Sequence, residues 1–578
     1  MNKNYPIYKT TFIDDMRALV EEAAQNFPER IAISYKENYW DKGVRKVTFK
    51  QWRIDVRNLG TALISNGLRE EKIAIIGENS YGWCCSFFAV MAIGSVTVPV
   101  DKELPLDDID GIISTTGCKA VIFGKTSEPK IKELLQKGAL KSVEMLVSVT
   151  PENTLDAEYA GGRTVTSLAV LQNEGAEIYA NGDNSYYDYK IDVNKLASIV
   201  FTSGTTGKGK GVMLSQANIG LDMTLGMYNF DITMKTLHVL PPHHTFGSTV
   251  NYVGHLSQGC EVYISSGIKH VSDEIREQQP THLILVPAFL EVMNRKIWTT
   301  ARKSGKEGLL KVMMKVSDGL RKIGIDIRKK LFSSVLSAFG GKLELIICGG
   351  AKLDEEIIRT FDSLGITILN GYGITECSPL ISANRNKYRK PGSVGTPILA
   401  CRVKIDDPDE NGEGEICVKG PNVMLGYYNN PEATAEVFDK DGFFHTGDYG
   451  RLDDEGWIYI TGRKKNLIIL SNGKNVYPEE IEADLQKVEG VCEVVVYAGE
   501  SRVQKDKITI VAEIFPDADL LNDKGIQDMQ KYFEDQVKLL NAKMPPYKAV
   551  KRVKLRDSEF QKNTSRKITR FNIDKTID

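Results

Sequence analysis

The sequence predicts an α/β protein with a separate α+β unit at its carboxyl end. Short β-branched strands such as Lys72–Ile76 and Ala120–Phe123 alternate with helical runs such as Phe49–Asn66, which is apolar at helical spacing. This alternation is typical of parallel sheets covered by helices. From Gly392 onward, short strands among Gly, Asp and Asn turns indicate a small antiparallel barrel or sheet. After Gly462, the order strand, helix, two strands, helix indicates a compact α+β domain.

The individual elements follow in order along the chain. Trp83–Val100 holds eighteen residues without a charge, which is the lower limit for a membrane span. Because Gly94 and Pro99 interrupt it, we expect a buried helix followed by a strand. Further predicted strands are Leu146–Val149, Leu196–Thr202, Glu261–Ser265, His282–Val286, Leu343–Cys348, Ile366–Leu369, Cys401–Ile405, Gly414–Lys419, Trp457–Thr461, Leu467–Leu470, Val491–Ala498 and Ile508–Ile514, with helices at Pro478–Lys487 and Ile526–Leu540.

The composition is that of an ordinary globular protein. Of 578 residues, 42% are hydrophobic and 26% are charged, and 74 basic against 76 acidic residues leave a net charge of −2. These values exclude a disordered or collagen-like chain and give no electrostatic reason to bind nucleic acid. Nine scattered cysteines without a C-x-x-C pair predict neither a zinc site nor a disulfide framework. Without an apolar leader sequence, the protein is expected in the cytoplasm, either free or peripheral to the inner face of the membrane.

A predicted strand runs into a loop that is rich in glycine, hydroxyl groups and lysine. Glycines let successive backbone N–H groups turn onto an anion, so the loop suits a polyphosphate. Two features argue against a P-loop: Gly211 stands where that motif needs a Mg²⁺-binding hydroxyl, and a short apolar run follows instead of a helix. The predicted phosphate-binding residues are Thr202, Ser203, Gly204, Thr205, Thr206, Gly207 and Lys210.

Further motifs offer groups that suit a nucleotide. Asn370–Glu376 (NGYGITE) supplies an aromatic plane for a purine and a hard carboxylate for Mg²⁺. Thr446–Asp448 supplies a carboxylate that can accept from both hydroxyls of a diol. Small residues at Cys348–Ala351 follow a strand, and two basic motifs lie at Gly462–Asn466 and Lys562–Arg570.

In this order the motifs resemble those of the adenylate-forming superfamily of acyl-CoA synthetases, luciferases and peptide-synthetase adenylation domains. The resemblance covers nearly the whole chain. It implies an α/β fold with a large N-terminal domain of two α/β subdomains, 1–195 and 196–391, plus a small β-barrel at 392–463. A small mobile α+β C-terminal domain, 464–578, would follow.

The resemblance also implies roles for single residues. Tyr372 would stack on adenine, and Asp448 would bind the ribose hydroxyls, with Arg463 also contacting the ribose. Lys465 would be the pivot between the large and small domains. The implied catalytic residues are Lys567, Glu376, Thr375 and Thr202, of which Glu376 and Thr202 would also hold Mg²⁺. The remaining implied ATP or AMP contacts are Gly349, Gly350, Ala351, Asn370, Gly371, Gly373 and Arg463, and the implied CoA-facing residues are Gly473 and Lys474.

The chain departs from the family pattern at four positions. Gly209 replaces a proline, Asn466 replaces an acidic residue, Arg566 replaces a glycine and Gln561 replaces the proline of the C-terminal motif. The first change loosens a turn of the phosphate loop, and the second removes a partner for a salt bridge.

The segment Pro241–Gly247 resembles the acyl-site segment of the family. It implies an acyl pocket formed by His244, Phe246 and Gly247. Adjacent histidines on a regular strand point to opposite faces, so His243 and His244 are not predicted to bind one metal.

A basic segment, Arg295–Phe332, carries twelve Lys or Arg residues against three acidic ones, with apolar residues recurring among them. One interpretation is a helical insertion with a solvated face. The other is a surface attracted to anionic lipid or to an acidic partner.

The function that the residues and the resemblance imply is an ATP-dependent acid–thiol ligase. It would convert a carboxylic acid, of medium or long chain, through an acyl-adenylate to acyl-CoA, releasing AMP and pyrophosphate, with ATP, Mg²⁺ and coenzyme A required. The basic insertion resembles the long-chain branch of the family. Two alternatives stay open: transfer to the phosphopantetheine of an acyl carrier protein, and a P-loop-type ATPase.

Overall fold

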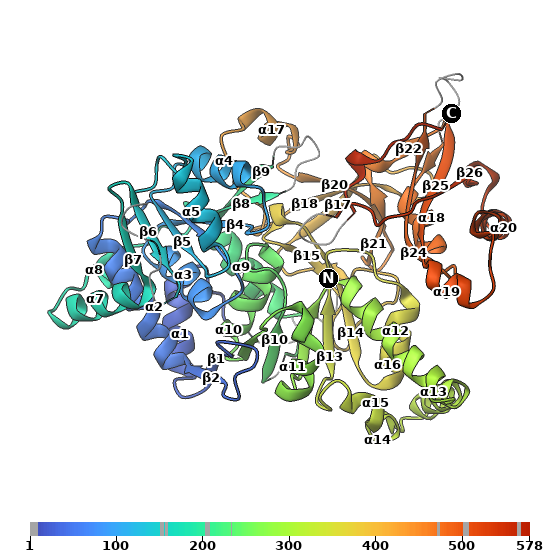
Figure 1. Cartoon of the computed structure of the whole chain (residues 1–578), viewed down its shortest axis with the longest axis horizontal. Helices are drawn as coiled ribbons and strands as arrows, with labels where there is room; N and C mark the ends of the chain where they lie inside the picture. Colours follow the sequence, from blue (N-terminus) through green and yellow to red (C-terminus); the bar gives the residue numbers. More distant parts are fainter. Residues whose placement is uncertain are drawn as a thin grey trace. The chain divides into compact units, whose positions relative to one another are not determined.

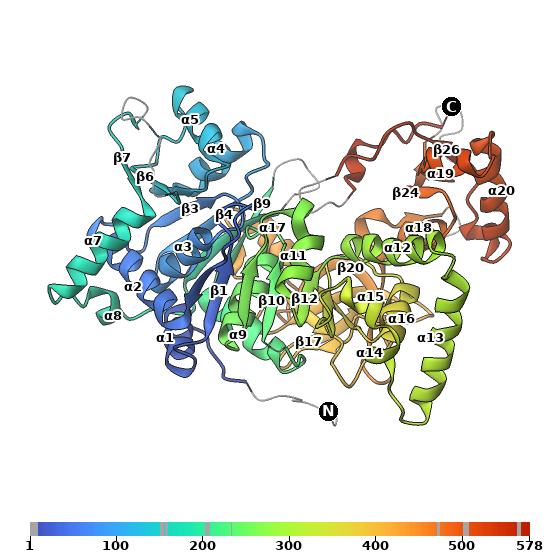
Figure 2. The same cartoon turned by 60° about the horizontal axis from the view of Figure 1, so that its bottom comes forward.

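The computed structural model describes residues 10–150, 155, 160–202, 209–232, 234–470, 474–500, 508–562 and 568–577. It divides into two compact units (Figures 1 and 2). The first unit holds residues 1–402, 418–442 and 455–457, and the second holds 403–417, 443–454 and 458–578. The predicted subdomain boundaries at 195, 391 and 463 stay predictions. Within the described residues, no helix combines the length and the apolar character that crossing a bilayer requires.

The first unit contains an eight-stranded sheet in the order β19-β9-β8-β4-β3-β5-β6-β7. The six strands from β8 to β7 in this order pair in parallel. Strand β9 pairs antiparallel with both of its neighbours, β8 and β19. The strands are β3 (Lys72–Ile76), β4 (Val96–Val100), β5 (Ala120–Phe123), β6 (Met145–Ser148), β7 (Thr164–Ser167), β8 (Leu196–Thr202), β9 (Lys210–Ser215) and β19 (Gly426–Tyr427).

Helices cover both faces of this sheet. In both views α4 and α5 lie on one face and α2 and α3 on the other. Since α3 is buried along most of its length and β4 follows it, the uncharged stretch Trp83–Val100 is a core helix and strand, as predicted. The helices around this sheet are α1 (Met16–Asn26), α2 (Phe49–Ser65), α3 (Tyr81–Ala92), α4 (Leu106–Thr116), α5 (Glu128–Gln136), α7 (Leu168–Ala180), α8 (Ser185–Asp188), α9 (Gln216–Met227) and α17 (Pro431–Glu436).

A second sheet of the first unit has nine strands in the order β16-β15-β14-β13-β12-β10-β11-β1-β2. Its central strands from β14 to β1 are parallel, and the strands at both edges are antiparallel. The strands are β1 (Ile31–Tyr35), β2 (Arg45–Thr48), β10 (Lys235–His238), β11 (Glu261–Ile264), β12 (His282–Leu285), β13 (Leu345–Cys348), β14 (Thr367–Gly373), β15 (Leu380–Ala383) and β16 (Thr396–Pro397).

One core cluster joins this sheet to the helices that cover it, including the basic segment, which is helical as predicted. The helices are the π-helix η1 (Phe246–Gly254), α10 (His255–Ser257), η2 (Ile268–His270), α11 (Val271–Gln278), α12 (Pro287–Lys303), α13 (Glu307–Lys322), α14 (Arg328–Leu331), α15 (Ser333–Ser337), α16 (Glu355–Leu364) and η3 (Thr375–Cys377).

The second unit is built from short antiparallel strands and an α+β portion with its own buried core. The strands are β17 (Arg402–Asp406), β18 (Gly414–Lys419), β20 (Phe444–Leu452), β21 (Ile458–Arg463), β22 (Ile468–Ile469), β23 (Asn475–Val476), β24 (Val491–Gly499), β25 (Thr509–Pro516) and β26 (Arg552–Leu555). Strand β17 begins in the first unit, and strand β18 ends there. The helices are η4 (Lys464–Asn466), α18 (Pro478–Leu485), α19 (Ala518–Asp523), α20 (Met529–Asn541), η5 (Pro546–Lys548) and η6 (Arg570–Asn572).

Candidate active site

The predicted phosphate loop connects two antiparallel strands. Thr202 at the end of β8 pairs with Lys210 at the start of β9, and the Thr202 hydroxyl donates to the Lys210 carbonyl at 3.4 Å. Ser203, Gly204, Thr205, Thr206 and Gly207 lie outside the described residues. After β9, Ser215 caps α9 in a capping box with Asn218. The short apolar run that follows the loop is the strand β9, whereas a P-loop opens onto a helix.

Gly209 is required by the close approach of the two strands. A Cβ at this position would lie 2.8 Å from the Thr202 carbonyl oxygen. The departure from the family's proline thus has a local cause in this chain, because any side chain here would push against the backbone of Thr202.

The NGYG motif lies on β14 itself. The predicted strand ended at Leu369, but β14 continues to Gly373 because Gly371, Tyr372 and Gly373 pair with the antiparallel strand β15. A Cβ at Gly373 would lie 2.0 Å from the carbonyl oxygen of Pro379, so only glycine fits there. Tyr372 and Asn370 are buried in this strand.

Motifs that are distant in sequence meet at the carboxyl edge of the second sheet. A Cβ at Gly349, which follows β13, would lie 3.4 Å from both the Gly371 carbonyl oxygen and the Phe246 ring. Gly350 takes a positive φ of 86°, which turns the chain toward Ala351 and α16. This edge, beyond the ends of parallel strands, is where ligands bind in open α/β sheets.

The acyl-site segment leads into the π-helix η1 and is not a strand. Gly247 fits closely, because a Cβ there would lie 2.0 Å from the Pro241 carbonyl oxygen. His243 and His244 precede η1 in a turn, with ring centroids 4.4 Å apart. The strand assumed in the argument against a shared metal was therefore wrong. Burial lowers the pKa of His243 to about 3, so this ring is neutral.

Glu376 lies in η3, directly after Thr375, and its side chain meets a residue from the other sheet. The hydroxyl of Tyr427 in β19 donates to Glu376 Oε1 at 3.1 Å. Lys210 Nζ lies 4.7 Å from the centroid of the same tyrosine ring. The predicted metal-binding carboxylate and the predicted phosphate-binding lysine therefore share Tyr427, which sequence reasoning did not identify. Its two-residue strand leaves no pattern that would have indicated it.

The predicted ribose-binding residues lie in the second unit and pair with each other. Asp448 in β20 and Arg463 in β21 are register partners, and Arg463 Nε lies 2.7 Å from Asp448 Oδ1. The Thr446 hydroxyl accepts from the Asp448 N–H at 3.1 Å, which fixes the backbone of the motif. The Asp448 side chain is buried and the Arg463 side chain is partly exposed.

The predicted pivot follows immediately. Lys465 lies in η4, and burial together with Arg463 lowers its pKa. Asn466 donates from Nδ2 to Glu479 Oε1 at 2.6 Å. An acid at 466 would face this carboxylate with like charge, which gives the family departure a physical reason.

The other predicted residues of this unit are only partly described. Lys474 Nζ lies 4.6 Å from the Tyr547 ring centroid. Gly473 and Lys567 lie outside the described residues. On either side of the segment that contains Lys567, Lys562 and Ile568 form an antiparallel bridge.

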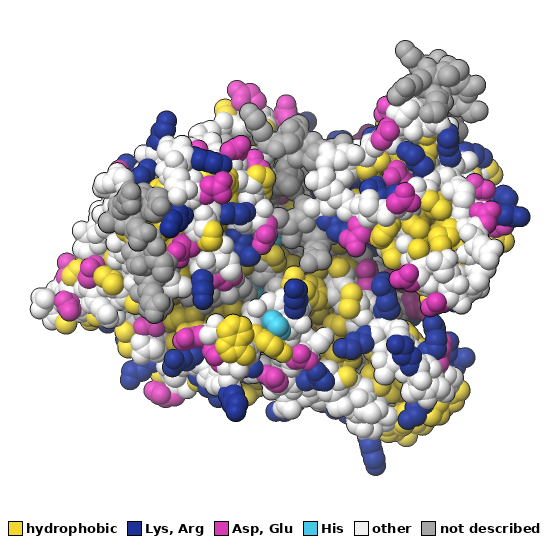
Figure 3. All heavy atoms as spheres, viewed as in Figure 1, with side chains coloured by type: hydrophobic (Ala, Val, Ile, Leu, Met, Phe, Trp, Pro, Cys, Tyr) yellow, Lys and Arg dark blue, Asp and Glu magenta, His cyan; other side chains and the backbone are white. Residues whose placement is uncertain are grey.

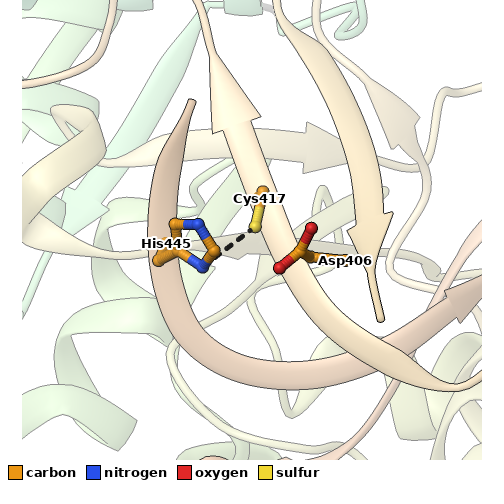
Figure 4. Close-up of side chains that lie close together, drawn as sticks. All are labelled: Asp406, Cys417 and His445. Carbon is orange, nitrogen blue, oxygen red and sulfur yellow. Dashed lines mark hydrogen bonds between the residues drawn. The ribbon is translucent and has the colours of Figure 1, made fainter. Parts of the chain in front are cut away.

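Potential metal ligands of three strands gather elsewhere in the second unit. Donor atoms of Asp406, Cys417 and His445 lie within 4.8 Å of one another (Figure 4). His445 Nδ1 also lies 3.0 Å from Glu415 Oε2, which accepts from Lys464 Nζ at 2.7 Å. The Lys464 ammonium already supplies the positive charge that a metal ion would bring to these side chains. We therefore interpret Asp406, Cys417 and His445 as part of a polar network that joins the strands.

The chain is similar to known enzymes over most of its length. Residues 20–428 match the family described as AMP-binding enzyme. The chain is 30% identical over 545 residues to long-chain-fatty-acid–CoA ligase 1 of Cavia porcellus, covering 88% of this chain and 75% of that one. It is 28% identical over 553 residues to the chloroplastic long-chain-fatty-acid–[acyl-carrier-protein] ligase AEE15 of Arabidopsis thaliana, covering 84% and 75%. The structure of the anthranilate CoA ligase AuaEII with anthranoyl-AMP superposes with a TM-score of 0.75 at 19% identity, covering 97% and 96%, and confirms the predicted fold class.

Proposed function

The chain belongs to the AMP-binding enzyme family, and from this premise we propose that it activates a medium- or long-chain fatty acid to its CoA thioester. It is an AMP-forming acid–thiol ligase. ATP, a carboxylic acid and CoA are its substrates. The proposal rests mainly on one observation: Tyr427 contacts both Glu376 and Lys210 beside the carboxyl edge of the second sheet.

Adenylation replaces a poor leaving group. The carboxylate of the acid attacks the α-phosphorus of ATP, the bond to the bridging oxygen breaks, and pyrophosphate leaves. Lys210 and the loop that begins at Thr202 would neutralise the departing pyrophosphate, and Thr375 would donate to the α-phosphate. Lys567 would place a positive charge on the same transition state. In the second step the thiol of CoA displaces AMP from the acyl-adenylate.

Glu376 and Thr202 fit Mg²⁺ by the chemistry of their donors, since carboxylate and hydroxyl oxygens are hard ligands. The Tyr427 hydrogen bond gives Glu376 a defined orientation for this role. A bound Mg²⁺ would neutralise phosphate charge and so stabilise the adenylation transition state. We propose Glu376 as the main ligand.

The test is an assay of the two half-reactions with a panel of acids. Acid-dependent exchange of labelled pyrophosphate into ATP, strongest with acids of eight or more carbons, is the expected result. Release of ADP and phosphate would favour the ATPase alternative instead. CoA and a phosphopantetheinylated acyl carrier protein, offered separately, decide the acceptor. One relative is a carrier-protein ligase, and faster thioester formation on the carrier would place this enzyme with it.

We further propose that the enzyme works in the cytoplasm at an anionic membrane surface, through α13. Leu309, Val312, Val316 and Ile323 are each more than half exposed and recur at helical spacing. Figure 3 shows hydrophobic side chains gathered over this region at the lower right, with Lys and Arg side chains around them.

The charges of α13 support the same surface. Lys315 and Lys322 lie on the exposed side of the helix, and no described carboxylate lies within 4.0 Å of either. A basic helix with an exposed apolar stripe suits the interface of an anionic bilayer, where each lysine contributes about 1 kcal/mol.

Flotation with vesicles of anionic lipid tests this surface. Lys315→Gln/Lys322→Gln should reduce binding about thirtyfold, and added salt should weaken binding of the unmodified protein. Lys42→Gln/Lys46→Gln removes the same charge from an exposed region away from α13 and should leave binding unchanged. Equal binding by all three proteins would leave α13 as a solvated insertion.

A further inference from the structure

A short segment of the first unit, Met424–Tyr428, connects the phosphate-loop strand to the predicted metal-binding turn. Its backbone donates in both directions: Met424 N–H to the Glu376 carbonyl at 2.9 Å, and Tyr428 N–H to the Gly211 carbonyl at 2.7 Å. Leu425 N–H donates to Met213 in β9 at 2.9 Å. The segment is therefore fixed to η3 at one end and to β9 at the other.

One side chain of this segment, Tyr427, contacts both predicted charged groups. Its hydroxyl faces Glu376 Oε1 at 3.1 Å, and its ring face receives Lys210 Nζ at 4.7 Å from the centroid. The tyrosine is 7% exposed, so both interactions are sheltered from water and stronger than on the surface.

The backbone of Tyr427 is held as firmly as its side chain. The Tyr427 N–H donates to Thr434 Oγ1 at 2.9 Å. The preceding Gly426 has a φ of 140° and would place a Cβ 2.8 Å from Thr434 Cγ2, so glycine is required there. A residue anchored on both sides in this way is suited to hold two other groups in place.

We propose that Tyr427 is a positioning residue for adenylation, which orients the Glu376 carboxylate and keeps it apart from the Lys210 ammonium. The inference rests on the proposed function. Carboxylate and ammonium attract each other, and a direct pair would neutralise the two charges that a divalent cation and a polyphosphate need. The phenol prevents this, because one group binds its hydroxyl end and the other its ring face.

The two contacts of Tyr427 can be removed one at a time. Tyr427→Phe deletes the donor to Glu376 and keeps the ring under Lys210. Tyr427→Leu deletes both and leaves room for Lys210 to reach Glu376. Tyr428→Phe is the matched control, since the Tyr428 hydroxyl makes no hydrogen bond recorded for the described part of the chain.

Binding of α,β-methylene-ATP by calorimetry, with and without Mg²⁺ and with no acid present, is the first measurement. Tyr427→Phe should lose about tenfold of the Mg²⁺-dependent affinity and none of the Mg²⁺-free affinity, as expected for a lost hydrogen bond to a charged group. Tyr427→Leu should lose affinity under both conditions. An unchanged Mg²⁺ dependence in Tyr427→Phe would overturn the proposal and leave Tyr427 as a packing residue.

A double-mutant cycle separates positioning from general destabilisation. On a Glu376→Gln background, Tyr427→Phe should have no further effect on the Mg²⁺ dependence, because the group that it orients is already neutral. Additive losses would contradict the proposal. If the unmodified enzyme exchanges no pyrophosphate with any acid, the proposed function fails, while the acid-free binding assay still decides the role of Tyr427.

Discussion

The residues predicted to bind ATP and the acyl group fall into two units, and the two sets are held in different ways. In the first unit the backbone itself packs closely: Cβ positions at Gly247 and Gly373 lie 2.0 Å from carbonyl oxygens. In the second unit the predicted ribose residues, Asp448 and Arg463, are held by an ion pair of 2.7 Å between side chains.

The difference teaches where each set tolerates change. A glycine that faces a carbonyl oxygen at this distance has no alternative, because any side chain must move backbone. The ion pair of Asp448 and Arg463 joins two side chains, which can rotate without moving the backbone. The first set is thus held by close backbone packing, and the second by a side-chain contact that can rearrange.

The largest expected effect tests Lys567, the predicted catalytic lysine near the end of the second unit's sequence. Lys567→Ala should lower adenylation about a thousandfold, because a charge that acts on the transition state is lost. Thioester formation from supplied acyl-AMP should survive. Pyrophosphate exchange and acyl-CoA appearance, measured separately, provide the comparison. Equal loss in both half-reactions would make Lys567 a general binding or folding residue.

The next effect tests the glycine set. Gly373→Ala should destabilise the protein by about 3 kcal/mol and reduce adenylation about a hundredfold, since the strand must move away from Pro379. Gly111→Ala is the control, because nothing lies within 4 Å of its Cβ position and it occupies the helix α4. It should be neutral or stabilising by denaturant unfolding. Similar losses in both variants would mean that close approach is not what fixes this site.

Several buried strands could be predicted from the sequence. The strands Lys72–Ile76, Ala120–Phe123 and Leu196–Thr202 are confirmed with their bounds, because buried parallel strands are continuous β-branched runs between turns. The glycine motifs could be identified for a different reason. Where the backbone packs too closely for a side chain, the sequence must have glycine.

The features that the sequence did not predict depend on contacts with residues far away in the sequence or have no local pattern. The strand predicted to end at Leu369 continues through glycines because β15 pairs with it. The π-helix η1 has no local pattern, and the turn at His243 was therefore mistaken for a strand. Tyr427 could not be identified, because its partners Glu376 and Lys210 lie in other segments and its strand has two residues.

The third effect tests whether the second set must change its conformation. Lys465→Pro should preserve adenylation and lower thioester formation about thirtyfold, because proline fixes φ at a predicted pivot. Labelled pyrophosphate exchange reports the first step and acyl-CoA appearance the second. Lys464→Pro, one residue earlier in η4, is the control for general disruption. An unchanged thioester rate would place the pivot elsewhere in the chain.

The smallest effect concerns the ion pairs of the second unit under acid. Burial works to raise the pKa of Glu415, but Lys464 and His445 more than offset it, so its pKa lies below the ordinary value of 4.5. A carboxylate with a lowered pKa stabilises the fold above its unfolded pKa, and this stabilisation is lost as the pH falls through the folded pKa.

Glu415→Gln should therefore cost about 1 kcal/mol of stability at pH 7. The two unfolding curves should converge as the pH falls below 4.5 and through the lowered pKa of Glu415. Glu410→Gln, at an exposed position of the same unit, should differ from the unmodified protein at no pH. A loss in Glu415→Gln that persists at low pH would show that packing, and not charge, holds these strands.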